Sequence, residues 1–368
     1  MPVEFIGMIQ AHERSELLHP RSQIYDAAID PPYIARFAQA HEEAGFDRVL
    51  IGASSSSPDG WSVASFAAAH TQRLSFLIAH RPGFVAPTLA ARKAITLDHL
   101  TGGRIALHVI TGGSDAEMQR DGDHLDHDTR YRRTDEYLDI VRKVWTSPAP
   151  FDYDGEFYQV KNAVSDVKPL QQPSIPLYFG GASGPAIPVG AKHADVYAAW
   201  GEPIAAIKER IAEVRSFTPP GRNPRFSVSL RLILGDTEER AWAKAHDYLE
   251  RIVALNGGKR TAQSARPCAV GSKRLLDFAA QQDLYDKRLW TPIAAATGAA
   301  GNSTALVGTP DQVAESLLDY YDAGATTLLI RGFAPLQDAI DYGRDIIPRV
   351  KAAVAQRDHA QSTTVAAD

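Results

Sequence analysis

The sequence has little of what builds a disulfide framework, a thiolate metal cluster or a membrane span. Cys268 is the only cysteine among 368 residues, so no disulfide and no cluster of thiolate ligands can form within the chain. No apolar run is long enough to cross a bilayer. The opening residues MPVEFIGMIQ lack the basic, apolar and small-residue order of a signal peptide. We therefore expect a cytoplasmic protein whose cysteine is inert.

An excess of charge of one sign is also missing. The chain has 39 Lys and Arg against 44 Asp and Glu, which gives a formal net charge of −5. No stretch concentrates the basic residues, as binding to nucleic acid or to an anionic membrane requires. We expect neither as a partner.

The chain does contain eight short β-branched or aliphatic runs, which alternate with amphipathic helical stretches. Most of the runs end beside Gly, Ser, Thr or a charged residue. They are Phe5 to Gln10, Arg48 to Ala53, Leu74 to Arg81, Ile105 to Thr111, Pro176 to Gly181, Val196 to Trp200, Phe226 to Gly235 and Thr327 to Gly332. This alternation predicts an α/β fold, a TIM (β/α)8 barrel with insertions, whose strand ends point at one shared site.

No linker divides the chain, so we expect one barrel domain over residues 1–355 and a flexible tail over 356–368. Residues 256–304 interrupt the pattern after the seventh strand. Their end, TPIAAATGAAGNST, is too rich in glycine and alanine to predict a rigid element. We interpret 256–304 as an insertion that ends in a mobile lid, Ala294 to Ser303.

A glycine-rich segment, FGGASGPA, follows the fifth predicted strand. Its glycines allow backbone N–H groups to approach an anion, and Ser183 and the start of the next helix add a hydroxyl and a dipole. The segment lacks the glycine spacing of dinucleotide-binding and P-loop motifs. It predicts a phosphate site, and an ordinary tight turn is the alternative.

A second polar segment, HLDHDTRY, lies in the long connection after the fourth strand. Two of its histidines are three residues apart, but no complete calcium or zinc pattern follows, so we expect no metal site. His127 and Tyr131 share one face if a helix begins early, and they would then contact one ligand. Asp126 or Asp128 can cap that helix at the same time.

Three segments together resemble the bacterial luciferase-like flavin-dependent monooxygenases, with the greatest similarity to their alkanesulfonate monooxygenase branch. They are TGGRIALHVITGG with DGDHLDHDTRY, the strand and loop IPLYFGGASGPA, and DVYAAWGEP. The similarity extends from about Phe5 to Val350 and includes LVGTPDQVAESL.

The resemblance implies a barrel that takes reduced FMN from a separate NAD(P)H:flavin reductase, reacts it with O2 and inserts one oxygen atom into a small substrate, such as an organosulfur compound or sulfonate. It also implies a homodimer or homotetramer. It assigns the FMN phosphate to Ser183, with its neighbours Gly181 and Ala182, and to Tyr131. His127 shares the face of Tyr131 and is assigned to the same ligand.

Four more residues at predicted strand ends have two interpretations each. Thr111 contacts the flavin ring or is a turn threonine, and Trp200 is a pocket wall or core filler. His80 and His12 control protons beside the flavin or are structural histidines. The family position favours the pocket for Trp200 and His12, and we favour proton control for His80.

The sequence departs from the sulfonate-oxidising relatives at five positions. Those relatives use a cysteine, an arginine and histidine pair, a lid arginine and a tyrosine, and here the positions read Ser57, Ser229, Arg231, the region of Ala299, and Phe333. Each lost charge-assisted hydrogen bond removes roughly 1.5 to 3 kcal/mol, which argues against a sulfonate held in the same manner.

Arg231 takes the family's histidine position, so we predict that it faces the pocket and controls charge. Arg331 pairs with a ligand carboxylate or forms an ion pair inside the fold. Ser57 donates to the reacting oxygen or belongs to the cap of the next helix. We assign Trp200, Ser229, Arg331 and Phe333 to a substrate pocket. Two other functions remain open, namely deazaflavin (coenzyme F420)-dependent hydride transfer and non-catalytic flavin binding.

Overall fold

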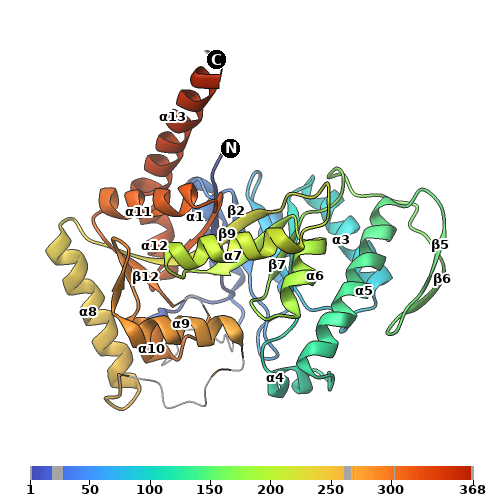
Figure 1. Ribbon diagram of the computed structural model, residues 1–368, viewed down its shortest axis with the longest axis horizontal. Helices are drawn as coiled ribbons and strands as arrows, with labels where there is room; N and C mark the ends of the chain where they lie inside the picture. The colour runs from blue at the N-terminus through green and yellow to red at the C-terminus, as the bar shows by residue number, and fades with distance from the viewer. Residues whose placement is uncertain (1, 19–27, 261–266, 268, 302, 366–368) are drawn as a thin grey trace.

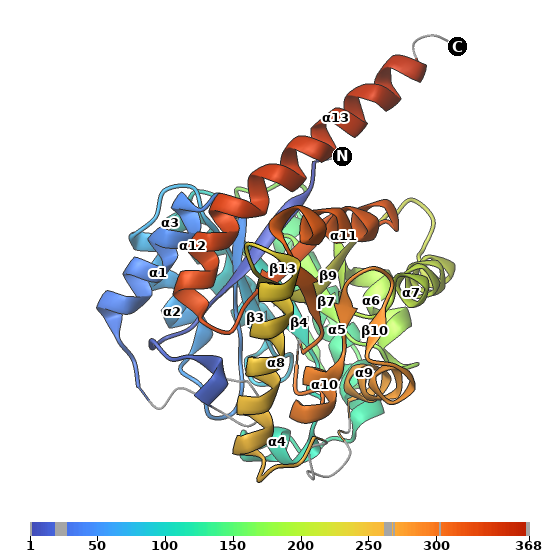
Figure 2. The same ribbon diagram turned by 90° about the vertical axis from the view of Figure 1, so that its left-hand side faces the viewer.

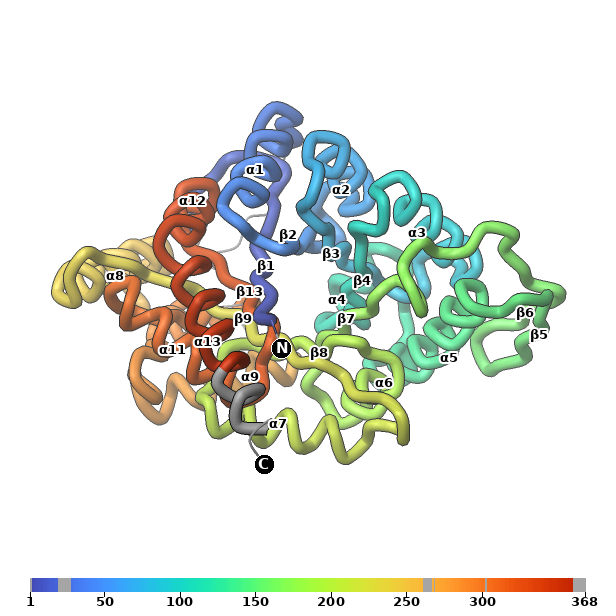
Figure 3. The backbone as a smooth tube through the Cα atoms, turned by 90° about the horizontal axis from the view of Figure 1, so that it is seen from above, coloured from blue at the N-terminus to red at the C-terminus, as the bar shows by residue number. Residues whose placement is uncertain are grey.

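The computed structural model describes residues 2–18, 28–260, 267, 269–301 and 303–365. Eight parallel strands form a closed barrel, in which each strand pairs with the next and the last pairs with the first. The barrel is seen from the side in Figure 1 and from above in Figure 3. The strands are β1 (Glu4–Ile9), β2 (Arg48–Ile51), β3 (Ser75–His80), β4 (Ile105–Ile110), β7 (Leu177–Gly180), β8 (Val196–Trp200), β9 (Arg225–Leu234) and β13 (Thr327–Arg331). Each coincides with one of the eight predicted runs, although β1 and β9 begin one residue earlier, at Glu4 and Arg225. The predicted (β/α)8 barrel is therefore confirmed.

Helices surround the barrel, as the view along its axis shows (Figure 3). They are α1 (Pro31–Glu43), α2 (Gly60–Ala69), α3 (Pro87–Thr101), α5 (His127–Thr146), α6 (Ala186–His193), α7 (Ile204–Phe217), α11 (Pro310–Asp322) and α12 (Pro335–Asp345). Local sequence explains several of their starts. Asp30, Asp59 and Asp126 accept N-cap hydrogen bonds, and Thr309 and Gln312 form a capping box before α11.

The alternation of strand side chains separates two apolar layers. Phe5, Phe76 and Phe179 point outward and pack under the helices, while Ile6 and Leu77 point inward and pack inside the barrel. Successive residues of a strand face opposite sides. The parity of a strand residue, that is, whether its side chain points into or out of the barrel, therefore decides whether it can reach a ligand at the barrel mouth.

An ionic network closes the amino-terminal end of the barrel. The Glu4 carboxylate accepts hydrogen bonds from Arg48 Nε at 3.0 Å, from the Tyr178 hydroxyl at 2.9 Å and from Arg225 Nη1 at 3.2 Å. Burial acts to raise the pKa of Glu4, but Arg48, Arg225 and Tyr178 outweigh it and lower the pKa.

The insertion after β9 is built from α8 (Glu238–Leu255), α9 (Val270–Gln281), β10 (Leu284–Tyr285), β11 (Leu289–Trp290), α10 (Pro292–Thr297) and β12 (Ala305–Gly308). β9 has 10 residues. Its carboxyl-terminal part, residues 231–234, pairs with β12, and residues 227–231 pair with β13. The prediction of no rigid element at the end of the insertion is wrong, because Ile293, Ala294 and Ala296 in α10 are fully buried. Small alanines allow this close packing. Movement of 294–303 as a lid stays a prediction, and Cys268 lies outside the described residues.

The chain ends in α13 (Ile347–Val365), which projects away from the barrel (Figure 2). This helix includes most of the tail expected after residue 355, and the flexibility of that tail stays a prediction. The remaining elements are η1 (Glu16–Leu18), α4 (Asp115–Arg120) and a surface hairpin of β5 (Phe151–Asp154) and β6 (Gln159–Ala163). Within the described ranges, no helix combines the length and the apolar character that a bilayer crossing needs.

Candidate functional site

Two cavities lie at the carboxyl ends of the barrel strands, where side chains of different strands converge. The first cavity, of about 300 Å3, is bounded mainly by the ends of β3, β4, β7, β8 and β9 and by the start of α9. The second cavity, of about 290 Å3, is bounded mainly by the ends of β1 and β2. Arg81 lines both cavities.

The first cavity has a wall that suits an anion. Ser183 is buried, and its Oγ has no hydrogen-bond partner of good geometry. At Gly181 a Cβ atom would lie 2.7 Å from the Ala186 Cβ and 3.1 Å from the Tyr131 hydroxyl, so glycine keeps the space beside both open. α6 begins at Ala186 without a side-chain cap, and the N–H groups of Ala186 and Ile187 donate to the Ser183 carbonyl at 2.9 and 3.2 Å instead.

The phenol of Tyr131 completes this wall. It is buried, and burial raises its pKa, while hydrogen bonds from Ser183 and Thr111 act in the opposite direction. His127 lies at the first position of α5, with its ring centroid 5.0 Å from that of Tyr131. The structure thus brings the six residues assigned to the cofactor, namely Thr111, His127, Tyr131, Gly181, Ala182 and Ser183, into one cavity.

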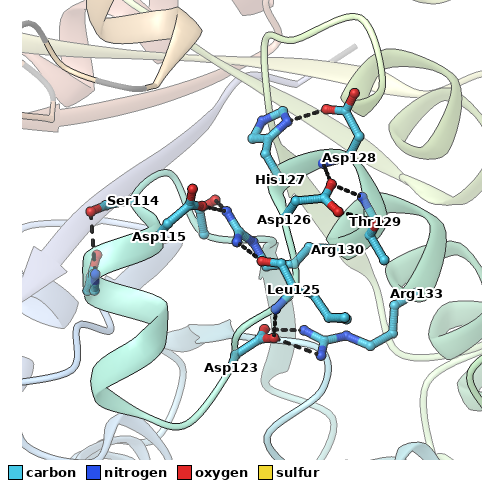
Figure 4. A network of polar contacts seen from close by, with 12 residues as sticks. Ser114, Asp115, Asp123, Leu125, Asp126, His127, Asp128, Thr129, Arg130 and Arg133 are labelled. Atoms are coloured by element: carbon cyan, nitrogen blue, oxygen red, sulfur yellow. Dashed lines mark hydrogen bonds and ion pairs between the residues drawn. The ribbon is translucent and has the colours of Figure 1, made fainter.

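Two arginines of α5 hold the connection between β4 and α5 in place (Figure 4). Arg130 is 1% exposed, and it donates to the Leu125 carbonyl at 2.5 Å, to Asp115 at 2.8 Å and to the Gly112 carbonyl at 3.3 Å. Arg133 pairs with Asp123 and also donates to the Pro82 carbonyl at 3.1 Å. Sequence reasoning missed both, although basic residues three apart beside an aspartate-rich connection could have indicated them.

His80 does not lie in either cavity, so the prediction that it reaches the flavin is wrong in its geometry. Its Nε2 hydrogen-bonds the Tyr137 hydroxyl at 2.7 Å, and its ring contacts Trp61 edge-on under the helices. Burial lowers the pKa of His80 to about 4. The reason is strand parity, because Leu77 and Arg81 point inward and His80 therefore points outward.

The prediction that Arg231 faces the pocket is also wrong. It is 1% exposed, lines neither cavity, pairs with the buried Glu16 and donates to the Gly332 carbonyl at 2.6 Å. Its guanidinium lies 4.3 Å from the centroid of the Phe333 ring. Phe333 is itself fully buried against Tyr248, so its assignment to the substrate pocket is wrong too. The ion pair with Glu16 holds the Arg231 guanidinium away from both cavities.

Arg331 lines the second cavity and forms the ion pair inside the fold that was one of its two interpretations. Its Nη2 lies 2.6 Å from Glu16 Oε2. Burial and the neighbouring Arg231 lower the pKa of Arg331 to about 10, and Glu16 acts to raise it. The second cavity thus has an internally paired cation on its wall.

Of the remaining predicted residues, three line one of the two cavities and His12 lines neither. Trp200 and Ser229 line the first, and Ser57 lines the second. Ser57 Oγ accepts from the Ser54 N–H at 2.9 Å and donates to the Ser54 carbonyl at 3.1 Å, so it organises its own turn before the Asp59 cap. His12 is partly exposed after β1 and lines neither cavity.

His108, in the middle of β4, points into the barrel. It lines the first cavity, and its Nδ1 is buried without a hydrogen-bond partner among the described residues. Burial lowers the pKa of His108 to about 4, so the ring is neutral at pH 7. Sequence reasoning passed over it, although a lone polar residue inside the apolar run Ile105 to Ile110 was a signal.

The profile of the luciferase-like monooxygenase family matches residues 3–327, which is most of the barrel and its insertion. The chain belongs to the luciferase-like monooxygenase family. Membership confirms the family that the sequence motifs predicted and the prediction that the chain is an enzyme of the flavin-dependent monooxygenase class. The alkanesulfonate branch stays a prediction.

Three solved structures illustrate the likeness of fold. Riboflavin lyase (RcaE), determined with modified FMN and riboflavin, has a TM-score of 0.78 and 18% identity, over 96% of this chain and 92% of that one. Long-chain alkane monooxygenase (LadA) has a TM-score of 0.74 and 19% identity, over 97% and 92%. EDTA monooxygenase (EmoA) from Chelativorans sp. BNC1 has a TM-score of 0.73 and 18% identity, over 96% and 94%. At these identities the shared property is the fold.

Proposed function

We propose that this protein is a two-component monooxygenase, which takes reduced FMN from a separate NAD(P)H:flavin reductase and inserts one oxygen atom of O2 into a small organic substrate. The observation that carries the proposal is the wall of the first cavity formed by Ser183, Gly181 and Tyr131. This wall combines a buried hydroxyl that lacks a hydrogen-bond partner of good geometry with an open space beside Gly181 that a side chain would fill.

The residues of this wall fit the phosphate of FMN. A phosphate is an anion whose oxygens accept hydrogen bonds, and the hydroxyls of Ser183 and Tyr131 can donate to it at the point where Gly181 lets the backbone approach. Burial keeps the Tyr131 phenol protonated by raising its pKa, so it can donate to an anion at neutral pH. The neighbouring side chains Ile110, Ala199 and Val270 give the same cavity an apolar part suited to a ring system.

The chain's own residues would bind and orient the cofactor. The Ser183 hydroxyl and main-chain N–H groups of the loop around Gly181 and Ala182 would hold the phosphate, and Tyr131 would donate to it. Thr111, His127 and Trp200 would border the rest of the cofactor. When bound, reduced FMN would supply the electrons and the reaction with O2, while the protein excludes water and positions the substrate.

Arg130 and Arg133 support this task from behind the wall. Their hydrogen bonds to main-chain carbonyls of Gly112, Leu125 and Pro82 fix two loops at the cavity entrance. A cavity whose loops are held by buried side chains loses less conformational entropy on binding. We therefore treat both arginines as positioning residues of the cofactor site.

The proposal is tested first by binding. Fluorescence quenching titrations with oxidised FMN, and anaerobic titrations with reduced FMN, compare the wild type with Ser183→Ala and with the control Ser316→Ala. Ser316 is also buried, but it donates to the Gln312 carbonyl in α11 and does not line the cavity. Loss of the Ser183 hydroxyl should weaken FMN binding about tenfold or more, because hydrogen bonds to charged groups contribute roughly 1.5 to 3 kcal/mol.

The second test is turnover. The full chain is supplied with NADH, FMN, a generic flavin reductase and 18O2, and a panel of small substrates that includes organosulfur compounds is screened by mass spectrometry. Incorporation of one 18O atom supports the proposal. Binding of the deazaflavin coenzyme in place of FMN, or retention of oxidised FMN without any product, would replace it with hydride transfer or with flavin storage.

A further inference from the structure

The floor of the first cavity reaches into the interior of the barrel. It is formed by inward side chains of several strands, namely Ile6, Leu50, Leu77, His108, Tyr178, Ser227 and Leu329. The hydroxyl of Tyr178 already donates to Glu4 at 2.9 Å. The floor is therefore largely aliphatic. Unlike the Tyr178 hydroxyl, the imidazole of His108 has no carboxylate partner among the described residues.

The position of His108 follows from the sheet register. It pairs with Ala79 of β3 on one side and with Tyr178 of β7 on the other. Gly180, two residues beyond Tyr178, would place a Cβ atom only 3.2 Å from His108 Nε2. The small neighbours Ala79 and Gly180 thus leave room for the imidazole ring at the cavity surface.

Charged side chains line the rim of this cavity, and each has an oppositely charged partner. Arg81 pairs with Glu117 at 2.5 Å, Glu202 pairs with Arg274 at 2.5 Å, and Arg210 pairs with Glu213 at 2.7 Å. The buried charges below the floor, Glu4 and Arg48, pair with each other at 3.0 Å. No charged residue appears among the floor side chains of the described chain.

We propose, as an extension of the function proposed above, that this floor binds a compact uncharged substrate that carries a hydrogen-bonding oxygen, and that the His108 imidazole donates the hydrogen bond to that oxygen. A neutral imidazole has one donor nitrogen and one acceptor nitrogen, and His108 stays neutral because burial lowers its pKa to about 4. The aliphatic side chains around it would contact the apolar body of the substrate.

The same surface disfavours an anion. Moving a sulfonate or carboxylate from water to an aliphatic floor costs its hydration, and no neighbouring cation is available there to offset that cost. Ser229, which lines this cavity, offers a neutral hydroxyl. His108 is therefore a specificity-determining residue, and selection between neutral and anionic substrates is the property it should control.

The experiment uses two probes of nearly equal size, dimethyl sulfone, which is neutral, and methanesulfonate, which is an anion. Saturation-transfer NMR titrations with the full-length FMN-loaded protein measure both dissociation constants. We expect dimethyl sulfone to bind roughly tenfold tighter or more. Equal binding of the two probes, tighter binding of methanesulfonate, or no binding of dimethyl sulfone would overturn the inference. The wild-type protein alone is sufficient for this test.

Variants then assign the effect to His108. His108→Leu should weaken dimethyl sulfone binding several-fold, and His108→Asn, which keeps a donor, should recover part of the loss. His70→Leu is the control, because His70 is exposed at the end of α2. Unchanged binding by a folded His108→Leu protein would contradict the assignment. FMN titration of the same samples separates the two proposals. Absence of FMN binding by the wild type would argue against the proposed function. FMN binding without selectivity between the two probes would argue only against this inference.

Discussion

Arg231 and Arg331 lie side by side in the register of β9 and β13 and both donate to the Glu16 carboxylate. Glu16 and Arg231 are each 1% exposed, so this pair is removed from water, while the Arg331 side chain is 14% exposed on the wall of the second cavity. Removing the carboxylate would leave two like charges next to each other. This relationship makes Glu16 a structural residue at the border of the second cavity.

Glu16→Gln should therefore destabilise the fold by roughly 3 to 5 kcal/mol, as expected when one partner of a buried ion pair is removed. Urea unfolding followed by circular dichroism measures this change. Glu13→Gln is the control, because Glu13 pairs with Arg36 at an exposed site where its side chain is 61% accessible, and such pairs contribute about 0 to 1 kcal/mol. Equal effects of the two substitutions would refute the structural role of Glu16.

The Glu4 network predicts a pH dependence of stability. The pKa of Glu4 is lowered in the folded state relative to its usual 4.5, so its ionised form stabilises the fold above pH 4.5. This contribution disappears as the pH falls through the lower, folded-state pKa. The melting temperature of the wild type should exceed that of Glu4→Gln at pH 7, and the difference should shrink below pH 4.5. A difference that grows on acidification would contradict the prediction.

His80→Asn should lower stability without affecting the cofactor site. The substitution removes the buried hydrogen bond to Tyr137 and leaves the Tyr137 hydroxyl without its partner, which costs roughly 1 to 3 kcal/mol. FMN affinity should stay within about twofold, a change of roughly 0.4 kcal/mol. Tyr131→Phe is the comparison, since it keeps the ring and removes the hydroxyl in the cavity, and it should weaken FMN binding with little loss of stability. The reverse pattern would place His80 in the site.

Arg130→Met should weaken FMN binding about tenfold, equivalent to roughly 1.4 kcal/mol, because the Gly112 and Leu125 carbonyls and Asp115 lose their common donor. Arg132→Met is a matched control on the same helix, where the side chain is 59% exposed and pairs with Glu156. Fluorescence titration and thermal unfolding of both variants check the expectation. Similar FMN affinities for the two would show that the connection between β4 and α5 keeps its shape without Arg130.

The cofactor wall was predictable because its residues are close in sequence. FGGASGPA places Gly181 and Ser183 in one loop, and His127 and Tyr131 share a helix face at a spacing of four. In a parallel barrel both segments follow the carboxyl ends of strands and so meet at the same mouth. Local geometry and the closure of the barrel were sufficient here.

The identity of the inward histidine and the role of Arg231 were not predictable in the same way. The sequence by itself determined the eight strands, their order and the side of the barrel where the site lies, because hydrophobic periodicity and turn chemistry are local properties. Only the tertiary structure decided that His108 faces the cavity while His80 faces Tyr137, and that Glu16 holds Arg231. Strand parity and the pairing of buried charges depend on residues far apart in the chain, which come together only when the barrel closes.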